Sequence, residues 1–123
     1  MAAAVADYAP ISPAARKIKK DEGELVLRLT RTQDILSGLR ECKGVLKVGF
    51  AAETEDLVAN ASQKLHEKGL DLIVANPVPA SFATDRAEVT LIAQDGSTTL
   101  LGVLPKEVVA ERILDRVVEL LGC

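Results

Sequence analysis

The segment from residue 45 to residue 76 restricts the fold of this chain more than any other. Val45–Glu53 (VLKVGFAAE) and Leu70–Asn76 (LDLIVAN) are apolar runs of strand length. The residues between them carry an apolar stripe with helical spacing, formed by Leu57, Val58, Ala61 and Leu65. Gly69 follows and is expected to end the helix. A strand, a helix and a strand in this order predict a βαβ unit, in which the two strands run parallel.

The N-terminal third adds two predicted strands and a short predicted helix. Ala2–Ala6 is apolar and indicates a buried strand. In Glu24–Thr30 leucine alternates with other residues, which predicts a half-buried strand with one leucine face. Thr32–Leu39 predicts a helix capped by Thr32, just as Thr54 is expected to cap the helix of the βαβ unit.

The C-terminal third predicts a β-hairpin and a helix. Glu88–Gln94 and Ser97–Leu104 flank Asp95-Gly96, a strong hairpin signal. A final helix is expected from about Pro105, because proline suits a first helical position. Its core-facing positions are expected to be Val109, Ile113, Val117, Leu120 and Leu121. The predicted fold is α/β: a Rossmann-like three-layer sandwich with a mostly parallel sheet, a C-terminal β-hairpin and helix, and a basic flap loop.

The composition argues against a nucleic-acid partner and a membrane partner. The net charge is -3 and aromatic residues make up 2% of the chain, whereas nucleic-acid interfaces are basic and often use aromatic platforms. No apolar run approaches the length that spans a bilayer, so we expect a cytoplasmic protein. Cys42 and Cys123 lack metal-ligand spacing and are expected to be unpaired thiols. The single histidine, His66, is expected on a helix surface.

A basic run near the start contrasts with the acidic balance of the chain. It lies in a proline-spaced segment and consists of Arg16, Lys17, Lys19 and Lys20. One interpretation is a solvated charge run. The other is a loop that closes over a phosphate, because ligands of open α/β sheets bind outside the carboxyl ends of strands and lysines act there as compact charges.

Four other residues are candidates for the same ligand. Asp7 follows the first predicted strand, where it either caps a turn or holds a ribose hydroxyl, a base amino group or a metal. Phe50 either packs in the core or lies against a base or sugar. Lys64 and Lys68 share one helix face and either complement the helix dipole or clamp a polyphosphate. Together these residues predict an anionic ligand, and a nucleotide is the natural choice, although neither GxGxxG nor GxxxxGK[ST] is present.

Over nearly its whole length the chain resembles the bacterial phosphopantothenate–cysteine ligases. The motifs that carry the resemblance occur in the family's order: AAAVADY, KIKK, DIL, VGFAAET, KL..KGLDLIVAN and SF..D..EVTLI. In this family the ligase is usually the C-terminal half of a bifunctional enzyme, fused to a flavin-dependent phosphopantothenoylcysteine decarboxylase. The resemblance implies that residues 1–123 are the C-terminal portion of a ligase domain, since the family's upstream glycine-rich and asparagine-containing segments have no counterpart here.

The resemblance implies a step of coenzyme A biosynthesis. Family members use CTP and Mg²⁺ to join 4′-phosphopantothenate to cysteine through an acyl-cytidylate, and they are homodimers. Such chemistry requires charge neutralisation on the triphosphate and close positioning of the attacking carboxylate. Two alternatives stay open, namely a non-catalytic nucleotide-binding module and an assembly domain that uses Glu24–Thr30 and the adjacent flap as its partner surface.

The family's nucleotide contacts fall on identifiable positions of this sequence. They are Ala3, Ala4, Asp7, Lys17, Gln33, Asp34, Ile35, Leu36, Phe50, Lys64 and Lys68. Lys17 is the first lysine of KIKK, which in the family lies on a flap and is needed to carry the acyl-cytidylate to product. Gln33 replaces a family proline, so a different turn is expected there.

Overall fold

The computed structural model describes residues 5–19, 23–78 and 84–122. The chain divides into two compact units, Met1–Ile35 and Leu36–Cys123. A short helix, α1 (Ile35–Gly38), lies at the junction of the two units in the sequence. The first unit contains a two-stranded ribbon, and the second contains a sheet with its two helices.

The first unit is an antiparallel ribbon of two short strands. β1 (Tyr8–Pro10) pairs with β2 (Leu29–Arg31). The backbone amide of Ile11 donates to the carbonyl of Arg28 at 3.0 Å and extends the pairing by one residue. The predicted strand at Ala2–Ala6 lies mostly outside the described residues, and its last two residues are not in a strand.

The strand predicted at Glu24–Thr30 is wrong, because only its last two residues belong to β2. An alternating strand is half-buried only if another layer covers its apolar face. In this unit β1 pairs with β2 edge to edge, through backbone hydrogen bonds, and such pairing does not cover the face of a strand. The leucines of the segment are therefore exposed, with exposed fractions of 64% for Leu25 and 58% for Leu27.

The second unit is built on a mixed sheet of four strands. Their order in the sheet is β3 (Val48–Glu53), β4 (Leu72–Pro77), β5 (Arg86–Ala93) and β6 (Thr98–Pro105). β3 and β4 are parallel, which confirms the predicted βαβ unit. β5 runs antiparallel to both of its neighbours, β4 and β6. The predicted mostly parallel sheet is therefore corrected to a mixed sheet.

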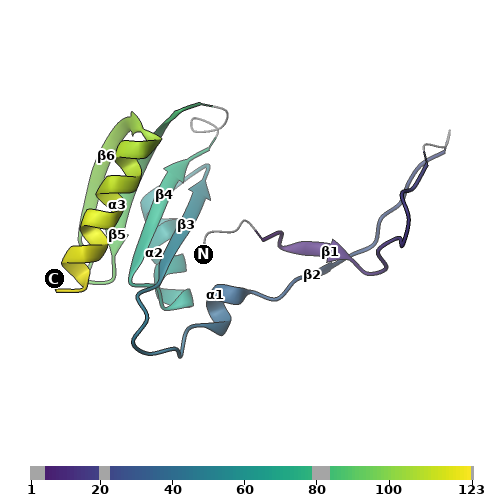
Figure 1. Ribbon diagram of the computed structural model, residues 1–123, viewed down its shortest axis with the longest axis horizontal. Helices are drawn as coiled ribbons and strands as arrows, with labels where there is room; N and C mark the ends of the chain where they lie inside the picture. Colours follow the sequence, from purple (N-terminus) through teal and green to yellow (C-terminus); the bar gives the residue numbers. More distant parts are fainter. Residues whose placement is uncertain (1–4, 20–22, 79–83, 123) are drawn as a thin grey trace. The chain divides into compact units, whose positions relative to one another are not determined.

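Two helices cover opposite faces of this sheet (Figure 1). Under α2 (Leu57–Lys68) the buried cluster is Ala51, Ala61, Leu65, Leu70, Ile73, Ala75 and Ile92. Under α3 (Lys106–Leu120) it is Leu72, Val74, Ala87, Val89, Leu91, Ala93 and Val109. Alternate residues of β4 enter both clusters, which is why this strand is an unbroken apolar run in the sequence. The second unit thus has one helix on each face of its mixed sheet.

The predicted end of α2 is confirmed, but its predicted start is not. Gly69 follows the helix with φ 60°, and its amide bonds the carbonyl of His66 at 3.2 Å. Glycine suits this left-handed position because it has no Cβ. The residue before the helix is Asp56, also left-handed with φ 45°, and not Thr54; its side chain makes no capping hydrogen bond.

Thr32 does not cap α1, because that helix begins three residues later. Its hydroxyl instead donates to the carbonyl of Ala6 at 2.6 Å. The side chain therefore joins the two strand segments of the first unit. Hydroxyl groups of this kind satisfy backbone groups in turns as readily as at helix ends.

The C-terminal hairpin and helix follow the prediction closely. The amide of Ala93 donates to the carbonyl of Ser97 at 3.0 Å and closes the turn. α3 begins directly after Pro105. Four of its five expected core positions pack against the buried cluster, namely Ile113, Val117 and Leu120 beside the buried Val109. Leu121 is the exception, because it follows the helix and is 58% exposed.

Candidate functional site

A carboxylate and a helix lysine meet at the end of β3. Glu53 is the last residue of the strand, and its carboxylate lies 2.5 Å from the ammonium nitrogen of Lys64 on α2. The Glu53 side chain is only 11% exposed, whereas that of Lys64 is 46% exposed. The pair therefore fixes a cation close to the carboxyl end of a parallel strand, where α/β proteins commonly bind ligands.

The second predicted lysine lies one helical turn further along α2. Lys68 is the last residue of the helix and is partly buried. Residues four apart lie on the same face of a helix, so the sequence prediction that Lys64 and Lys68 share a face is met by the observed helix. His66, between them, is exposed, and its Nδ1 lies 2.7 Å from the carbonyl oxygen of Ser62.

Phe50 lies on the opposite face of the sheet from α2. It belongs to β3, is 69% exposed, and lines a groove between the sheet and α3. This α3 groove has a volume of about 320 Å³, and its lining residues are Phe50, Val74, Asn76, Ala87, Val89, Lys106, Val109, Ala110 and Ile113. The core-packing interpretation of Phe50 is therefore wrong. The structure also separates Phe50 from the Lys64 side of the sheet.

The α3 groove contains two polar residues that sequence reasoning missed. Asn76 is in β4, beside the end of β3, and Lys106 is the first residue of α3. Asn76 ends the LDLIVAN motif, whereas Lys106 belongs to none of the quoted motifs, and only the packing of α3 onto the sheet brings the two into one groove. Glu53 was missed as well, although it lies within the VGFAAET motif.

In the first unit, the structure brings Asp7 next to the segment expected to contact a nucleotide. The amide of Thr32 donates to the carbonyl of Asp7 at 2.9 Å. Asp7 therefore neighbours Gln33 and Asp34, and all three are exposed. Of the two remaining residues of this segment, Ile35 is exposed, whereas Leu36 packs against the buried cluster under α2.

Lys17 lies in the segment that connects β1 to β2. The residue is exposed and belongs to no helix or strand. Lys19 is exposed in the same way, and Lys20 lies outside the described residues, as do Ala3 and Ala4. An exposed lysine on a connecting segment is free to contact a ligand, and the alternative of a solvated charge run stays open.

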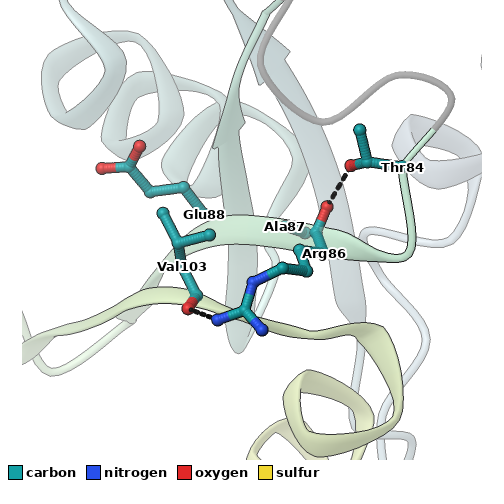
Figure 2. Close-up of a pocket in the computed structure, with 5 residues that line it drawn as sticks. All are labelled: Thr84, Arg86, Ala87, Glu88 and Val103. Atoms are coloured by element: carbon teal, nitrogen blue, oxygen red, sulfur yellow. Dashed lines mark hydrogen bonds between the residues drawn. The ribbon is translucent and has the colours of Figure 1, made fainter.

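A second hollow lies along the hairpin, and two of its polar side chains already make hydrogen bonds within the protein (Figure 2). It has a volume of about 250 Å³ and is lined by Thr84, Arg86, Ala87, Glu88 and Val103. The Arg86 guanidinium donates to the Val103 carbonyl at 2.8 Å, and the Thr84 hydroxyl donates to the Arg86 carbonyl at 2.7 Å. The first bond ties β5 to β6, the second is local to the start of β5, and none of the predicted site residues lines this hollow.

The turn between β5 and β6 carries a charge cluster at the other end of the sheet. The Ser97 amide donates to the Asp95 carboxylate at 2.8 Å, and the Arg116 guanidinium lies 3.4 Å from the same carboxylate. The hydrogen bonds from Ser97, together with Arg116, lower the pKa of Asp95 below its ordinary value. The amide of Gln94 bonds the carbonyl of Asp71, just before β4, so this cluster lies away from the strand ends that carry Glu53.

Within residues 5–19, 23–78 and 84–122, no three histidine, cysteine or acidic side chains are grouped so as to hold a metal ion. None of the helices in this part of the chain is long and apolar enough to cross a membrane. Cys42 is an exposed free thiol.

The second unit combines an α/β fold with a lysine near a strand end and a groove beside α3, and small-molecule sites in proteins commonly have such features. The family model for the DNA/pantothenate metabolism flavoprotein C-terminal domain matches residues 1–121. The chain therefore belongs to this family.

Two similar proteins are consistent with membership of this family. The chain is 43% identical to the coenzyme A biosynthesis bifunctional protein CoaBC of Bacillus subtilis, over 96% of this chain and 30% of that protein. It is 38% identical to a cysteine/cysteine sulfinic acid decarboxylase of an unknown prokaryotic organism, over 98% of this chain and 35% of that protein. The chain thus spans about a third of the length of the curated relatives that it matches.

A solved structure supports the fold. The crystal structure of the C-terminal domain of CoaBC is similar with a TM-score of 0.72 and 36% sequence identity, over 98% of this chain and 52% of that chain. The mixed α/β fold of this chain is therefore that of the family domain.

Proposed function

We propose that this chain is the CTP-binding portion of a phosphopantothenate–cysteine ligase. The observation that carries the proposal is the Glu53–Lys64 pair, which holds a cation close to the carboxyl end of a parallel strand. A triphosphate needs such fixed cations, because its charge must be neutralised before a carboxylate can approach. The similarity to CoaBC proteins and the KIKK and VGFAAET motifs support the same assignment.

The proposed reaction has two steps. A carboxylate oxygen of 4′-phosphopantothenate attacks the α-phosphorus of CTP, the bond to pyrophosphate breaks, and an acyl-cytidylate forms. The amine of cysteine then attacks the acyl carbon, the bond to CMP breaks, and an amide forms with release of a proton. Holding the reactants close together and in line should increase the rate of both steps by several orders of magnitude.

Each predicted residue except Phe50 has a proposed role in this reaction. Lys64 and Lys68 neutralise the triphosphate, and Glu53 orients Lys64. Asp7 and the adjoining segment 33–36 contact the nucleotide, as does the backbone of residues 3 and 4. Lys17 acts from a basic flap loop between β1 and β2, where it contacts the acyl-cytidylate during its conversion to product.

We expect Mg²⁺ to bind at the proposed site together with the nucleotide, mainly through the phosphate oxygens. This ion is usually held by substrate phosphates and one or two carboxylates, with water completing the shell. The exposed carboxylate of Asp7 is suited to that arrangement. When bound, Mg²⁺ would neutralise phosphate charge and favour departure of pyrophosphate.

The proposed partners include a second copy of the chain. Val26 and its leucine neighbours form an exposed apolar segment next to β2, and Val26 itself is 79% exposed. Exposed apolar surface of this kind marks interaction sites. We expect Leu27→Asp to shift the chain from dimer to monomer in sedimentation experiments, and an unchanged mass would contradict this surface. A fused decarboxylase half is a further proposed partner, since CoaBC is described as bifunctional.

A second candidate function is decarboxylation, as the name of one relative states for that protein. In this case the domain would accompany a decarboxylase without making the amide bond. A non-catalytic nucleotide-binding module is the weaker form of the ligase proposal. Release of CO₂ from cysteine sulfinate, amide formation from cysteine, and nucleotide binding without product distinguish the three.

The test of the proposed function is a calorimetric titration with CTP and Mg²⁺ beside ATP, followed by a product assay. We expect saturable binding of CTP and weaker binding of ATP. Amide product in the presence of 4′-phosphopantothenate and cysteine would establish the ligase. The absence of CTP binding by a folded chain would contradict a nucleotide site in this portion of the domain.

A further inference from the structure

β6 is an edge strand of the four-stranded sheet, because only β5 pairs with it among the described residues. The backbone groups on its outer side therefore point away from the sheet. Its sequence is uncharged, and two of its side chains, Leu100 and Val103, are 76% and 54% exposed. An uncharged apolar strand at a sheet edge is a template for pairing with another chain.

The register of the hairpin shows which backbone groups of β6 face outward. The amide of Lys106 donates to the carbonyl of Asp85 at 2.9 Å, so these two residues form a hydrogen-bonded pair just beyond the two strands. Hydrogen-bonded and non-hydrogen-bonded pairs alternate along an antiparallel ladder. Counting back from Lys106, Pro105 and Val103 lie in non-hydrogen-bonded pairs. The carbonyl and the amide of Val103 therefore point away from β5, toward the free edge.

Arg86 occupies this outward-facing carbonyl. It is the first residue of β5, and its guanidinium donates to the Val103 carbonyl at 2.8 Å (Figure 2). Arg86 lies six positions before Ile92 in the same strand, so both side chains share the face of the sheet that α2 covers at Ile92. The Arg86 side chain therefore reaches across β6 on this face to its outer edge. It supplies a cation to the edge of a strand that has no charged residue of its own.

Two other features of β6 act in the same direction. Pro105 has no amide hydrogen to offer at its outward-facing position. The register shifts by one residue at Leu101, next to Gly102 with φ 66°, which marks a β-bulge. A bulge twists an edge and makes it a poorer template for another strand. The Val103 carbonyl lies between these two features, and Arg86 occupies it.

We propose that Arg86 closes the free edge of β6 against pairing with β6 of a second copy of this chain. An incoming strand would have to displace the guanidinium from the Val103 carbonyl or bury its charge, and burying an unpaired charge is costly. A second copy is the expected occupant of an open edge, because a two-fold axis would place the same uncharged strand on both sides of the contact. This inference does not rest on the proposed ligase activity, and it concerns the second unit rather than residues 25–27.

Arg86→Met tests this role in the Leu27→Asp chain, so that association through residues 25–27 does not contribute. We expect the mass of the variant in sedimentation experiments to at least double with rising concentration, while Leu27→Asp alone keeps one mass. Amide hydrogen exchange along the outward side of β6, including the amide of Val103, should slow at least tenfold on association. A constant mass, or association that leaves exchange along β6 unchanged, would overturn the proposal.

Three further variants of the same parent chain separate the edge contact from general effects of charge. Arg112→Met removes an exposed arginine of α3 whose contact is with Asp115, and it should keep the mass of the parent. Arg86→Lys keeps a cation that donates, and it should also keep that mass. Adding Leu100→Lys to Arg86→Met places a charge on β6 itself and should restore the parent mass. Association of Arg112→Met or of the double variant would contradict the role of Arg86.

Thermal unfolding shows whether each variant retains the fold. Because Arg86 is exposed, Arg86→Met should melt close to the parent chain. If it melts earlier, Arg86→Gln provides the same test, since it removes the charge and shortens the side chain but stays polar. Arg86→Gln should associate through β6 as Arg86→Met does, and a folded Arg86→Gln chain of constant mass would overturn the proposal.

Discussion

Glu53 at the end of β3 and Lys64 on α2 are joined by an ion pair of 2.5 Å, although they lie eleven positions apart in the sequence. The glutamate side chain is nearly buried and the lysine side chain is about half exposed. Such a pair holds the ammonium group in one position, whereas a solvated lysine samples many rotamers. The ion pair therefore holds the ammonium group of Lys64 at a fixed position near the end of β3.

We expect Lys64→Met to weaken CTP binding about tenfold, since a charged contact to phosphate is lost. The substitution also leaves the Glu53 carboxylate unpaired, which should cost about 1 kcal/mol of stability. The double variant Glu53→Gln/Lys64→Met should recover that stability without recovering CTP affinity. Calorimetry and thermal unfolding measure the two effects, and recovery of affinity in the double variant would contradict a direct role for Lys64.

Lys17 should affect product formation more than nucleotide affinity. It is exposed on a segment without regular structure, so Lys17→Met should leave the melting temperature unchanged. We expect amide formation to fall about a hundredfold or more, in the range seen when a single charge-stabilising donor is removed, while the Kd for CTP changes little. Lys19→Met, two residues along the same segment, is the control. Equal losses in both variants would favour a solvated charge run.

The Asp95 cluster predicts a loss of stability in acid. The pKa of Asp95 is lowered in the folded chain, mainly by its hydrogen bonds with Ser97 and then by Arg116. A depressed carboxyl pKa stabilises the fold at pH values above the unfolded pKa, near 3.9, and this contribution disappears as the pH falls through the lower folded pKa. Asp95→Asn should therefore melt earlier than wild type at pH 6, and the difference should shrink toward pH 3.

The control for this pH effect is Asp115→Asn. Asp115 is an exposed carboxylate with a long contact of 3.9 Å to Arg112, so its removal should change the melting temperature little at any pH. Melting curves recorded from pH 6 to pH 3 measure both variants. A difference between wild type and Asp95→Asn that persists unchanged at pH 3 would argue against the hydrogen-bonded carboxylate as its cause.

Gly69→Ala should destabilise the chain by about 1–2 kcal/mol, because an L-residue is strained in the left-handed conformation. The added Cβ would also lie 2.9 Å from Cγ of Arg40. Gly38→Ala is the matched control: among the described residues nothing lies within 4 Å of its added Cβ, and we expect a change within about 0.5 kcal/mol. Urea unfolding measures both, and equal effects would refute the role assigned to the positive φ.

The sequence alone was sufficient for the elements whose apolar pattern is long and whose apolar faces are covered by neighbouring elements of the fold. The βαβ unit, the hairpin and α3 were predicted because their apolar residues repeat with the period of a strand or a helix over many positions. The glycine after α2 could also be predicted, since few residues adopt a left-handed helix end. The segment at Glu24–Thr30 failed because alternation indicates a strand only if another layer covers one face.

Only the tertiary structure decided which side chains share a surface. The repeat of α2 placed Lys64 and Lys68 on one helix face, but the partnership with Glu53 depends on how closely that helix packs against β3. Phe50 was selected from the sequence, yet the face of the sheet on which it lies follows from the folded structure. Successive side chains of β3 point to opposite faces, and Phe50 lies on the face opposite α2. Lys106 joins Phe50 because α3 packs across strands distant in the chain. Short-range periodicity fixes local structure, whereas long-range packing decides the members of a site.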